Sequence, residues 1–254
     1  MANHIYLMIK IFDNEEHADA FLNKGEMYCR TLGEFKKIEG DEHRGDQYEG
    51  VTDWHQPDQI KLTISFRNEN GVEKTIPIEK LAGPLIMQNT AYDRLNLFCM
   101  YAIKVEEFKE VYSTEEERKV VIERLNKSFA EQTKVNEKSF ELGDFAVMVY
   151  KVEDFIEKIR KHIFDNGHEF SKGLVKYYDP ETFHGSFKGI ESVFRKRNIY
   201  SYQSEYRFAF YLKNTDIGTQ TISVGSLKDC AIKIPTKELN GLKIELSDST
   251  DKPE

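Results

Sequence analysis

Short runs of β-branched and aromatic residues recur along this chain, and they constrain its fold more than any other feature. The clearest runs cover residues 4–12, 95–103 and 206–212. Their length and composition are typical of buried strands. No run approaches the ~18 consecutive apolar residues that a membrane-spanning helix needs. We therefore expect a strand-rich protein with no membrane partner.

A turn signal joins two further strand patterns. Asn70-Gly71 lies between the patterns at 61–66 and 74–78, and this dipeptide between alternating segments predicts a β-hairpin. The polar stretch 39–59 between the early and middle strands has little periodicity and is expected to be an irregular loop. Other strands are expected at 26–31, 143–152, 173–178, 219–224 and 229–235.

Helical patterns are interspersed with these strands. Asp13 and Ser113 are expected as the N-caps of two helices, because an acidic residue follows each after three positions. Three more helices are expected at 32–38, 152–164 and 186–197. Because there is no linker and no repeat, we predict a single α+β domain over 1–246, with a mixed, mostly antiparallel sheet and flanking helices. Residues 247–254 are expected to form a disordered tail.

The composition excludes several classes of protein. Hydrophobic residues make up 39% and aromatic residues 12% of the chain, too many for a disordered or low-complexity protein. The net charge of −8 gives no overall positive field, which excludes a basic nucleic-acid coat but not a local basic patch. Three widely spaced cysteines, and the absence of a charged leader before a long apolar run, favour a reduced, cytoplasmic protein.

The first candidate site lies at the entrance of the strand at 206–212. Gln203 and Glu205 are two residues apart, so on a strand their side chains point to the same face. A carboxylate and an amide side by side can hold a ribose diol or orient a nucleophile. The alternative, which spacing alone favours, is that Glu205 and Arg207 belong to an ion-pair ladder on an exposed face.

The second candidate site lies within the polar stretch 39–59. Arg44, Asp46, Tyr48 and Glu49 are bracketed by glycines, which suits a defined loop at the rim of a site. The alternative is a solvated turn whose charges pair among themselves. The basic and aromatic run 194–202 would hold phosphates and stack a base, or would be the basic end of a surface helix.

Other chemistries lack their sequence signals. The histidines do not fall at metal-ligand spacing, so we expect no metal site. The chain contains no phosphate-binding loop, no nucleophile elbow and no dinucleotide fingerprint of the Rossmann type. Cys99 lies in an apolar strand, where cysteine usually packs as a small hydrophobe rather than acting as a nucleophile.

The order of these elements resembles a bacterial and phage family. The resemblance rests on IKIFDNEEHADAFLNKG, EMYCRTL, the loop with Asp46, Tyr48 and Glu49, LNLFCMYAI, FAVMVYKVEDFIEKI, GLVKYYD, RNIYSYQSEYRFAFYL and VGSLKDCAIKI. In outline that family is similar to the ADP-ribosyltransferase superfamily, which includes toxins acting on nucleic acids and members of phage-defence systems. The resemblance implies an ADP-ribosyltransferase-like fold and NAD as cofactor.

The resemblance also implies roles for individual residues. Glu205 would hydrogen-bond the nicotinamide ribose 2′-hydroxyl and stabilise an oxocarbenium-like transition state, and Gln203 would help select the acceptor. Cofactor binding would fall to Lys10, Tyr28, Arg30, Tyr202 and Arg207. Two positions depart from the family pattern: Lys10 stands where His or Arg is usual, and the loop lacks the usual Asn and Pro.

Three functional hypotheses follow. The first is an enzyme that uses NAD to modify a nucleic acid or a protein in a toxin, phage-defence or phage-encoded system. The second is a non-catalytic binding protein on the same fold, an inhibitor, antitoxin or sensor acting through a nucleotide or protein partner, and Lys10 favours it. The third is a phosphoryl enzyme in which Asp46 and Glu49 bind Mg²⁺.

Overall fold

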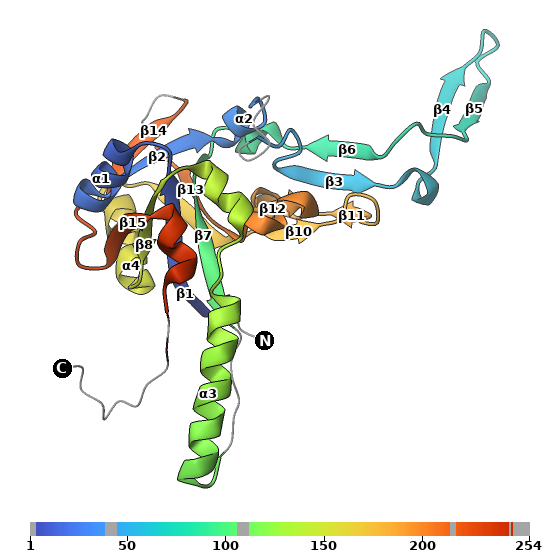
Figure 1. Ribbon diagram of the computed structural model, residues 1–254. Coiled ribbons are helices and arrows are strands. Elements are labelled where there is room, and N and C mark those ends of the chain that lie inside the picture. The colour runs from blue at the N-terminus through green and yellow to red at the C-terminus, as the bar shows by residue number, and fades with distance from the viewer. Residues whose placement is uncertain (1–3, 39–44, 106–111, 214–216, 244, 246–254) are drawn as a thin grey trace.

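The computed structural model describes residues 4–38, 45–105, 112–213, 217–243 and 245 (Figure 1). Arg44 and the predicted tail at 247–254 lie outside this part of the chain. The architecture is α+β with mostly antiparallel strands and flanking helices, which confirms the predicted class. Within the described residues, no helix combines the length and the apolar character needed to cross a bilayer.

The main sheet contains eight strands, and every pairing in it is antiparallel. The spatial order is β14-β2-β7-β1-β8-β15, with β13 also paired to β7 and β9 paired to β13. The strands are β1 (His4–Phe12), β2 (Glu26–Thr31), β7 (Asn96–Val105), β8 (Phe145–Val149), β9 (Glu169–Leu174), β13 (Glu205–Tyr211), β14 (Gln220–Ser223) and β15 (Ala231–Pro235).

The sheet divides at β7. One edge of β7 pairs with β13 from Asn96 to Tyr101. The other edge is shared, because β1 pairs with it from Tyr101 onward and β2 pairs only at Asn96 and Leu97. Between Leu97 and Tyr101 of β7, neither β1 nor β2 pairs with this edge. Instead, the Nζ atom of Lys10 donates a hydrogen bond to the Cys99 carbonyl at 2.9 Å. The divergence of β1 and β2 leaves room for a cleft.

Helices and apolar side chains enclose the sheet. In the described part of the chain the α-helices are α1 (Glu15–Lys24), α2 (Leu32–Phe35), α3 (Glu115–Gln132) and α4 (Val152–Asp165). Phe21 of α1 and Phe155 of α4 pack against the same face of the sheet, with ring centroids 6.0 Å apart. Gly25 ends α1 at φ +64°, and a Cβ atom there would lie 2.3 Å from the Gly225 carbonyl oxygen. The glycine that caps α1 is therefore also a point of close packing.

Both predicted N-caps are wrong by one residue. Asn14, not Asp13, caps α1, since its side chain accepts a hydrogen bond from the Glu16 amide. Thr114, not Ser113, caps α3 and forms a capping box with Glu117. In each case two adjacent residues could serve as the cap. Before α3 both have a glutamate three positions on, so the spacing does not separate them; before α1 the spacing favours Asp13, because His17 is the residue three positions after Asn14.

A smaller β-ribbon interrupts the predicted loop at 39–59. Its strands are β3 (Val51–His55), β6 (Leu85–Gln88) and β11 (Gly185–Ser186). The loop prediction is wrong for β3 because the polar residues of this short strand hide its alternation. Trp54 of β3 is buried in an aromatic cluster with Tyr178 and Phe187. The ribbon thus has a small core of its own, separate from the main one.

The segment 186–197, expected as an α-helix, also differs. A 3-10 helix (Gly189–Phe194) leads into β12 (Arg195–Arg197), which pairs in parallel with β10 (Lys176–Tyr178). The strand predicted at 173–178 is accordingly two strands, β9 and β10, interrupted at Val175. Further 3-10 helices cover Pro57–Gln59, Thr90–Tyr92, Glu137–Leu142, Asn198–Gln203 and Thr236–Gly241.

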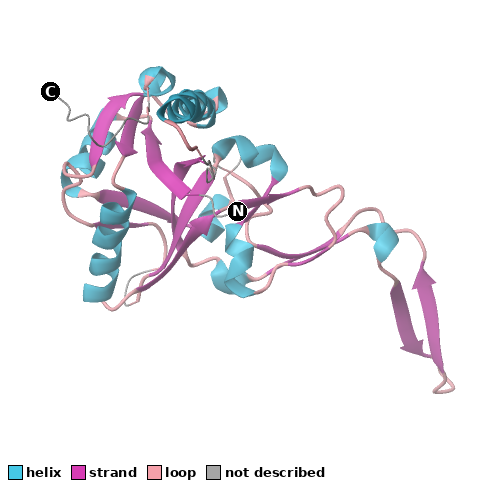
Figure 2. Ribbon diagram, turned by 90° about the horizontal axis from the view of Figure 1, so that it is seen from below, coloured by secondary structure: helices cyan, strands magenta, loops and turns pink. Residues whose placement is uncertain are grey.

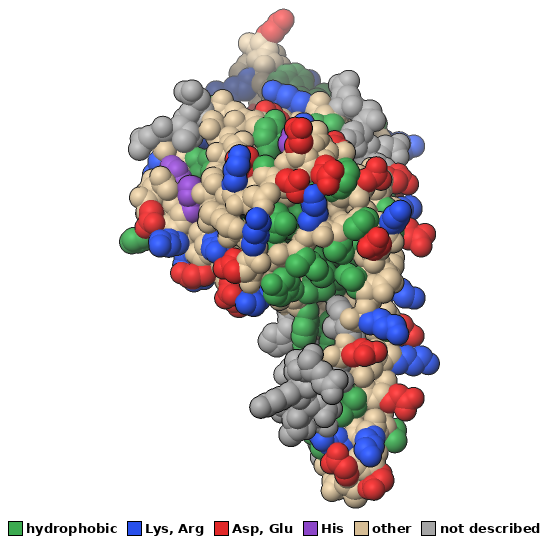
Figure 3. All heavy atoms as spheres, turned by 60° about the vertical axis from the view of Figure 1, so that its left-hand side comes forward, with side chains coloured by type: hydrophobic (Ala, Val, Ile, Leu, Met, Phe, Trp, Pro, Cys, Tyr) green, Lys and Arg blue, Asp and Glu red, His purple; other side chains and the backbone are tan. Residues whose placement is uncertain are grey.

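Two elements project from the body. The predicted hairpin is confirmed as β4 (Leu62–Arg67) and β5 (Glu73–Ile78), with Gly71 at φ +74° in its turn, and it extends well away from the main sheet (Figures 1 and 2). Helix α3 extends in another direction, anchored at its C-terminal end where Phe129 packs on Val105. Charged side chains of both signs cover the exposed surface of α3 (Figure 3).

Candidate functional site

A cleft of about 690 Å³ lies where β1 and β2 diverge from β7. This volume is in the range of small-molecule and cofactor pockets, roughly 300–1,000 Å³. Its walls come from β1, β2, β7, β12 and β13, which are far apart in the sequence. The predicted site residues that line it are Lys10, Tyr28, Arg30, Glu49, Gln203, Glu205 and Arg207.

Strand alternation explains one wall of the cleft. On β2, Met27 and Cys29 point into the core, so Tyr28 and Arg30 point to the other face, where they line the cleft. The Tyr28 ring is 59% exposed, and the Arg30 guanidinium lies 5.9 Å from its centroid. This wall therefore offers an exposed aromatic face beside a cation.

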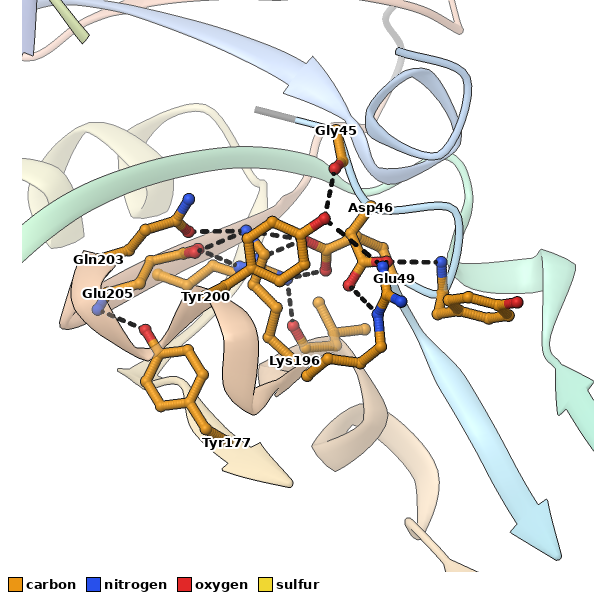
Figure 4. A network of polar contacts seen from close by, with 12 residues as sticks. Gly45, Asp46, Glu49, Tyr177, Lys196, Tyr200, Gln203 and Glu205 are labelled. Carbon is orange, nitrogen blue, oxygen red and sulfur yellow. Dashed lines mark hydrogen bonds and ion pairs between the residues drawn. The ribbon is translucent and has the colours of Figure 1, made fainter. Parts of the chain in front are cut away.

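A network of polar contacts that includes Glu49, Lys196 and Glu205 forms part of the cleft lining (Figure 4). A buried arginine, Arg207, also lines the cleft. Arg207 is 1% exposed, and its Nη1 and Nη2 atoms donate to the two Glu49 carboxylate oxygens at 2.8 and 3.0 Å. Its Nε atom donates to Glu205 Oε1 at 2.7 Å, and Nη1 also donates to the Val193 carbonyl at 2.6 Å. The expectation of an exposed ion-pair ladder is wrong, because Glu205 and Arg207 pair inside the protein.

Lys196 completes this group, and the sequence reasoning did not single it out. Its Nζ atom donates to Gln203 Oε1 at 2.8 Å and to Glu205 Oε2 at 3.4 Å, and it lies 3.3 Å from Glu49 Oε1. The ammonium also lies 4.7 Å from the Tyr200 ring centroid. Two cations thus face two carboxylates, and we call Glu49, Lys196, Glu205 and Arg207 the ion cluster.

The short strand β12 explains how Lys196 reaches the cluster. Its middle residue, Lys196, is buried, whereas Arg195 and Arg197 on either side are half-buried. A strand of three residues shows too little alternation to be distinguished, from sequence, from the basic end of a helix. The sequence signal for Lys196 is the basic run 194–202 itself, and that run fits a phosphate site or the end of a surface helix equally well.

A second set of contacts fixes the loop that carries Glu49. Asp46 is buried and accepts a hydrogen bond from Arg197 Nη2 at 2.7 Å, and the Arg197 guanidinium lies 4.6 Å from the Tyr48 ring centroid. The Tyr200 hydroxyl donates to the Gly45 carbonyl at 2.9 Å. The predicted turn with internal pairing is wrong here, because its charges pair with residues distant in the sequence.

The other predicted residues in the described part of the chain, Asp46, Tyr48 and Tyr202, are not among those that line the cleft. Asp46 accepts a hydrogen bond from the Tyr48 amide at 3.0 Å, and the Tyr202 hydroxyl accepts a weak hydrogen bond from Gln203 Nε2 at 3.4 Å. Both carboxylates of the hypothetical Mg²⁺ site, Asp46 and Glu49, bind arginine side chains. Over the described ranges, no three His, Cys, Asp or Glu side chains are grouped as metal ligands.

The ion cluster keeps Glu205 ionised. Burial alone would raise the pKa of the Glu205 carboxyl, but Arg207 and Lys196 outweigh burial and hold that pKa well below its ordinary value. Burial raises the pKa of the neighbouring Cys99 thiol to about 12, and the Glu205 charge adds to that rise. A raised thiol pKa lowers the thiolate fraction at pH 7, which disfavours Cys99 as a nucleophile.

We expect acid to destabilise the protein through Glu205. Its pKa is lower in the folded state than the ordinary 4.5, so its contribution is fully present above that value and is lost as pH falls below it. Urea unfolding at pH 7, 5, 4 and 3 measures this loss. The Glu205→Gln variant should show a shallower loss between pH 5 and pH 3. Equal slopes for both proteins would contradict the assignment.

No family model, curated protein or solved structure matches the chain. The chemistry of the site therefore follows from its own residues. A fixed carboxylate can stabilise developing positive charge, cations can bind phosphate oxygens, and an exposed tyrosine ring can stack on a base. These three capacities meet in one cleft, at Glu205, at Lys10 with Arg30, and at Tyr28.

Proposed function

We propose that the cleft binds NAD and that the protein is an ADP-ribosyltransferase-like enzyme. One observation carries the proposal: an ionised carboxylate, Glu205, and an amide, Gln203, line the same cleft as Tyr28, Lys10 and Arg30. A dinucleotide needs an aromatic surface for a ring, cations for its phosphates and a polar group at its ribose. The resemblance noted in the sequence supports the same cofactor.

Residues that line the cleft would take the separate roles that transfer of ADP-ribose requires. NAD, when bound, would supply a nicotinamide leaving group, and its departure under the acceptor's attack would leave positive charge on the ribose in the transition state. Glu205 is held in place by Arg207 and Lys196, so its carboxylate would stabilise that charge without reorganising. Lys10 and Arg30 would face the phosphates, and Gln203 would orient the acceptor.

The acceptor and setting rest on the resemblance. We propose a nucleic acid or a protein as the acceptor, and a cytoplasmic role in a toxin, phage-defence or phage-encoded system. The net charge of −8 makes recruitment of nucleic acid by a general field unfavourable, so an RNA or DNA acceptor would have to bind locally.

One observation favours the non-catalytic alternative. Glu205 is only 5% exposed, and each of its carboxylate oxygens already binds a cation. In that case the cleft would bind a nucleotide without cleaving it. Nicotinamide release distinguishes the two proposals, because only the enzyme produces it.

We expect NAD to raise the melting temperature. A ligand at 100 times its Kd stabilises the folded state by about 2.7 kcal/mol, which corresponds to a shift of about 5–10 °C for a chain of this size. Arg30→Ala should reduce the shift, because it removes a cation from the cleft wall. Differential scanning fluorimetry measures the shift, and chromatography of the same sample measures nicotinamide.

The matched control for Arg30→Ala is Arg160→Ala, which removes an exposed arginine of α4. Its NAD-dependent shift should equal that of the wild type. If millimolar NAD leaves the wild-type melting temperature unchanged, the cleft does not bind the dinucleotide. A shift without nicotinamide release, with or without lysate as a source of acceptors, would support the binding protein instead.

A further inference from the structure

The β4–β5 hairpin, which we call the arm (residues 62–78), stands apart from the rest of the chain. Its two strands form a sheet of their own that no third described strand joins. The ribbon of β3 and β6 leads to it, and both views show it extending away from the main sheet (Figures 1 and 2). The arm is therefore not covered by its own body.

The register gives the arm two different faces. On one side of the hairpin, Lys74 lies opposite Phe66 near the turn. The rest of that side is apolar, because Leu62 pairs with Ile78, Ile64 pairs with Ile76, and Phe66 lies beside them. We call these five residues the apolar face. The opposite face carries polar groups, and there the Ser65 and Thr75 hydroxyls lie 3.0 Å apart. The arm is thus amphipathic, as a strand pair is when one face is covered.

The apolar face is nevertheless open to solvent. Ile64 is 53% exposed, Ile76 is 52% exposed, and Phe66 and Ile78 are also exposed. An isolated two-stranded hairpin is marginally stable in water unless something packs on it. A contiguous exposed apolar patch on a projecting element is typical of an interaction surface. Helix α3 projects too, but its charged surface suits solvent (Figure 3).

We propose that the apolar face packs against the same face of a second copy, in a two-fold symmetric dimer. Such a face is self-complementary, because each copy presents the same cross-strand pairs. Charge favours this occupant as well. The arm contains Arg67 and Lys74 against Glu69 and Glu73, so it is neutral, whereas the whole chain carries −8. Two arms can meet while the acidic bodies stay apart.

The size and edges of the arm define the kind of dimer. Six-residue strands are about 20 Å long, so the face is smaller than the ~800 Å² per partner of a standard interface. We therefore infer a weak dimer that forms at micromolar concentration. Pro77 removes a backbone donor from β5, which disfavours extension of the sheet at that edge and favours packing of the two faces.

Sedimentation velocity of the full chain tests the proposal. Between about 1 and about 500 µM the wild type should shift from monomer to dimer, as expected for a small interface. Ile64→Ser with Ile76→Ser should raise the dissociation constant at least about 100-fold, since four apolar side chains leave the interface. The control is Thr63→Ser with Thr75→Ser, which also places serine at one position of each strand but on the opposite face, and it should dimerise as the wild type does.

Hydrogen exchange gives a second readout that does not depend on the variants. Backbone amides of the arm should exchange more slowly at high protein concentration than at low concentration. The arm lies outside the core clusters, so the Ile64→Ser, Ile76→Ser variant should keep the wild-type melting temperature at low concentration. A wild type that is monomeric throughout, a dimer unaffected by the isoleucine substitutions, or arm amides that ignore concentration would overturn the proposal.

Discussion

Replacing Arg207 with methionine should lower the free energy of unfolding by about 3–5 kcal/mol, the range found when one partner of a buried ion pair is removed. The side chain is 1% exposed and has five N–H donors. It makes four hydrogen bonds, two to Glu49, one to Glu205 and one to the Val193 carbonyl. Without it, the two buried carboxylates of Glu49 and Glu205 would share one lysine, Lys196.

Urea unfolding of the Arg207→Met variant at pH 7 measures this loss. The matched control is Arg160→Met, which breaks an exposed pair with Glu157 on α4 and should change the free energy of unfolding by no more than about 1 kcal/mol. Arg207→Met combined with Glu49→Met should recover part of the loss, because the uncompensated charge is removed with its partner. Equal losses for Arg207→Met and Arg160→Met would show that the ion cluster does not stabilise the fold.

Local pattern was enough to predict much of the fold. The runs at 4–12 and 206–212 correspond to β1 and β13, because β-branched and aromatic residues there are buried on the sheet. The Asn70-Gly71 hairpin and the apolar stripe of α4 follow from turn chemistry and helical periodicity. The errors fall on short polar strands such as β3 and β12, where tertiary contacts rather than periodicity decide the conformation.

The candidate site was predicted only in part. Gln203, Glu205 and Arg207 share one short segment, so their grouping was visible in the sequence. The pair between Arg207 and Glu49 joins residues 158 positions apart, and no short-range pattern reports such a contact. The same holds for the cleft itself, which exists because β1 and β2 leave β7 in different directions. Glu205 and Arg207 were expected on an exposed face, because the sequence does not show which charged residues are buried together.

Replacing Glu205 with glutamine should reduce nicotinamide release by about 100- to 1,000-fold, the usual effect of removing one preorganised electrostatic group from an active site. This expectation rests on the proposed function. Glutamine keeps the size of the side chain and one carbonyl oxygen for Arg207 Nε, but it has no negative charge for the ribose. NAD binding, measured by the melting-temperature shift, should change much less, because Lys10 and Arg30 are untouched.

Glu49→Gln is the matched control, because Glu49 binds the same two cations, Arg207 and Lys196, and is equally buried. Both variants should lose similar stability by urea unfolding. Only Glu205→Gln should lose activity at a temperature where both remain folded, since the carboxylate of Glu205 alone is expected to face the ribose. If the two variants lose activity in parallel with stability, Glu205 holds the cleft together and does not act on NAD.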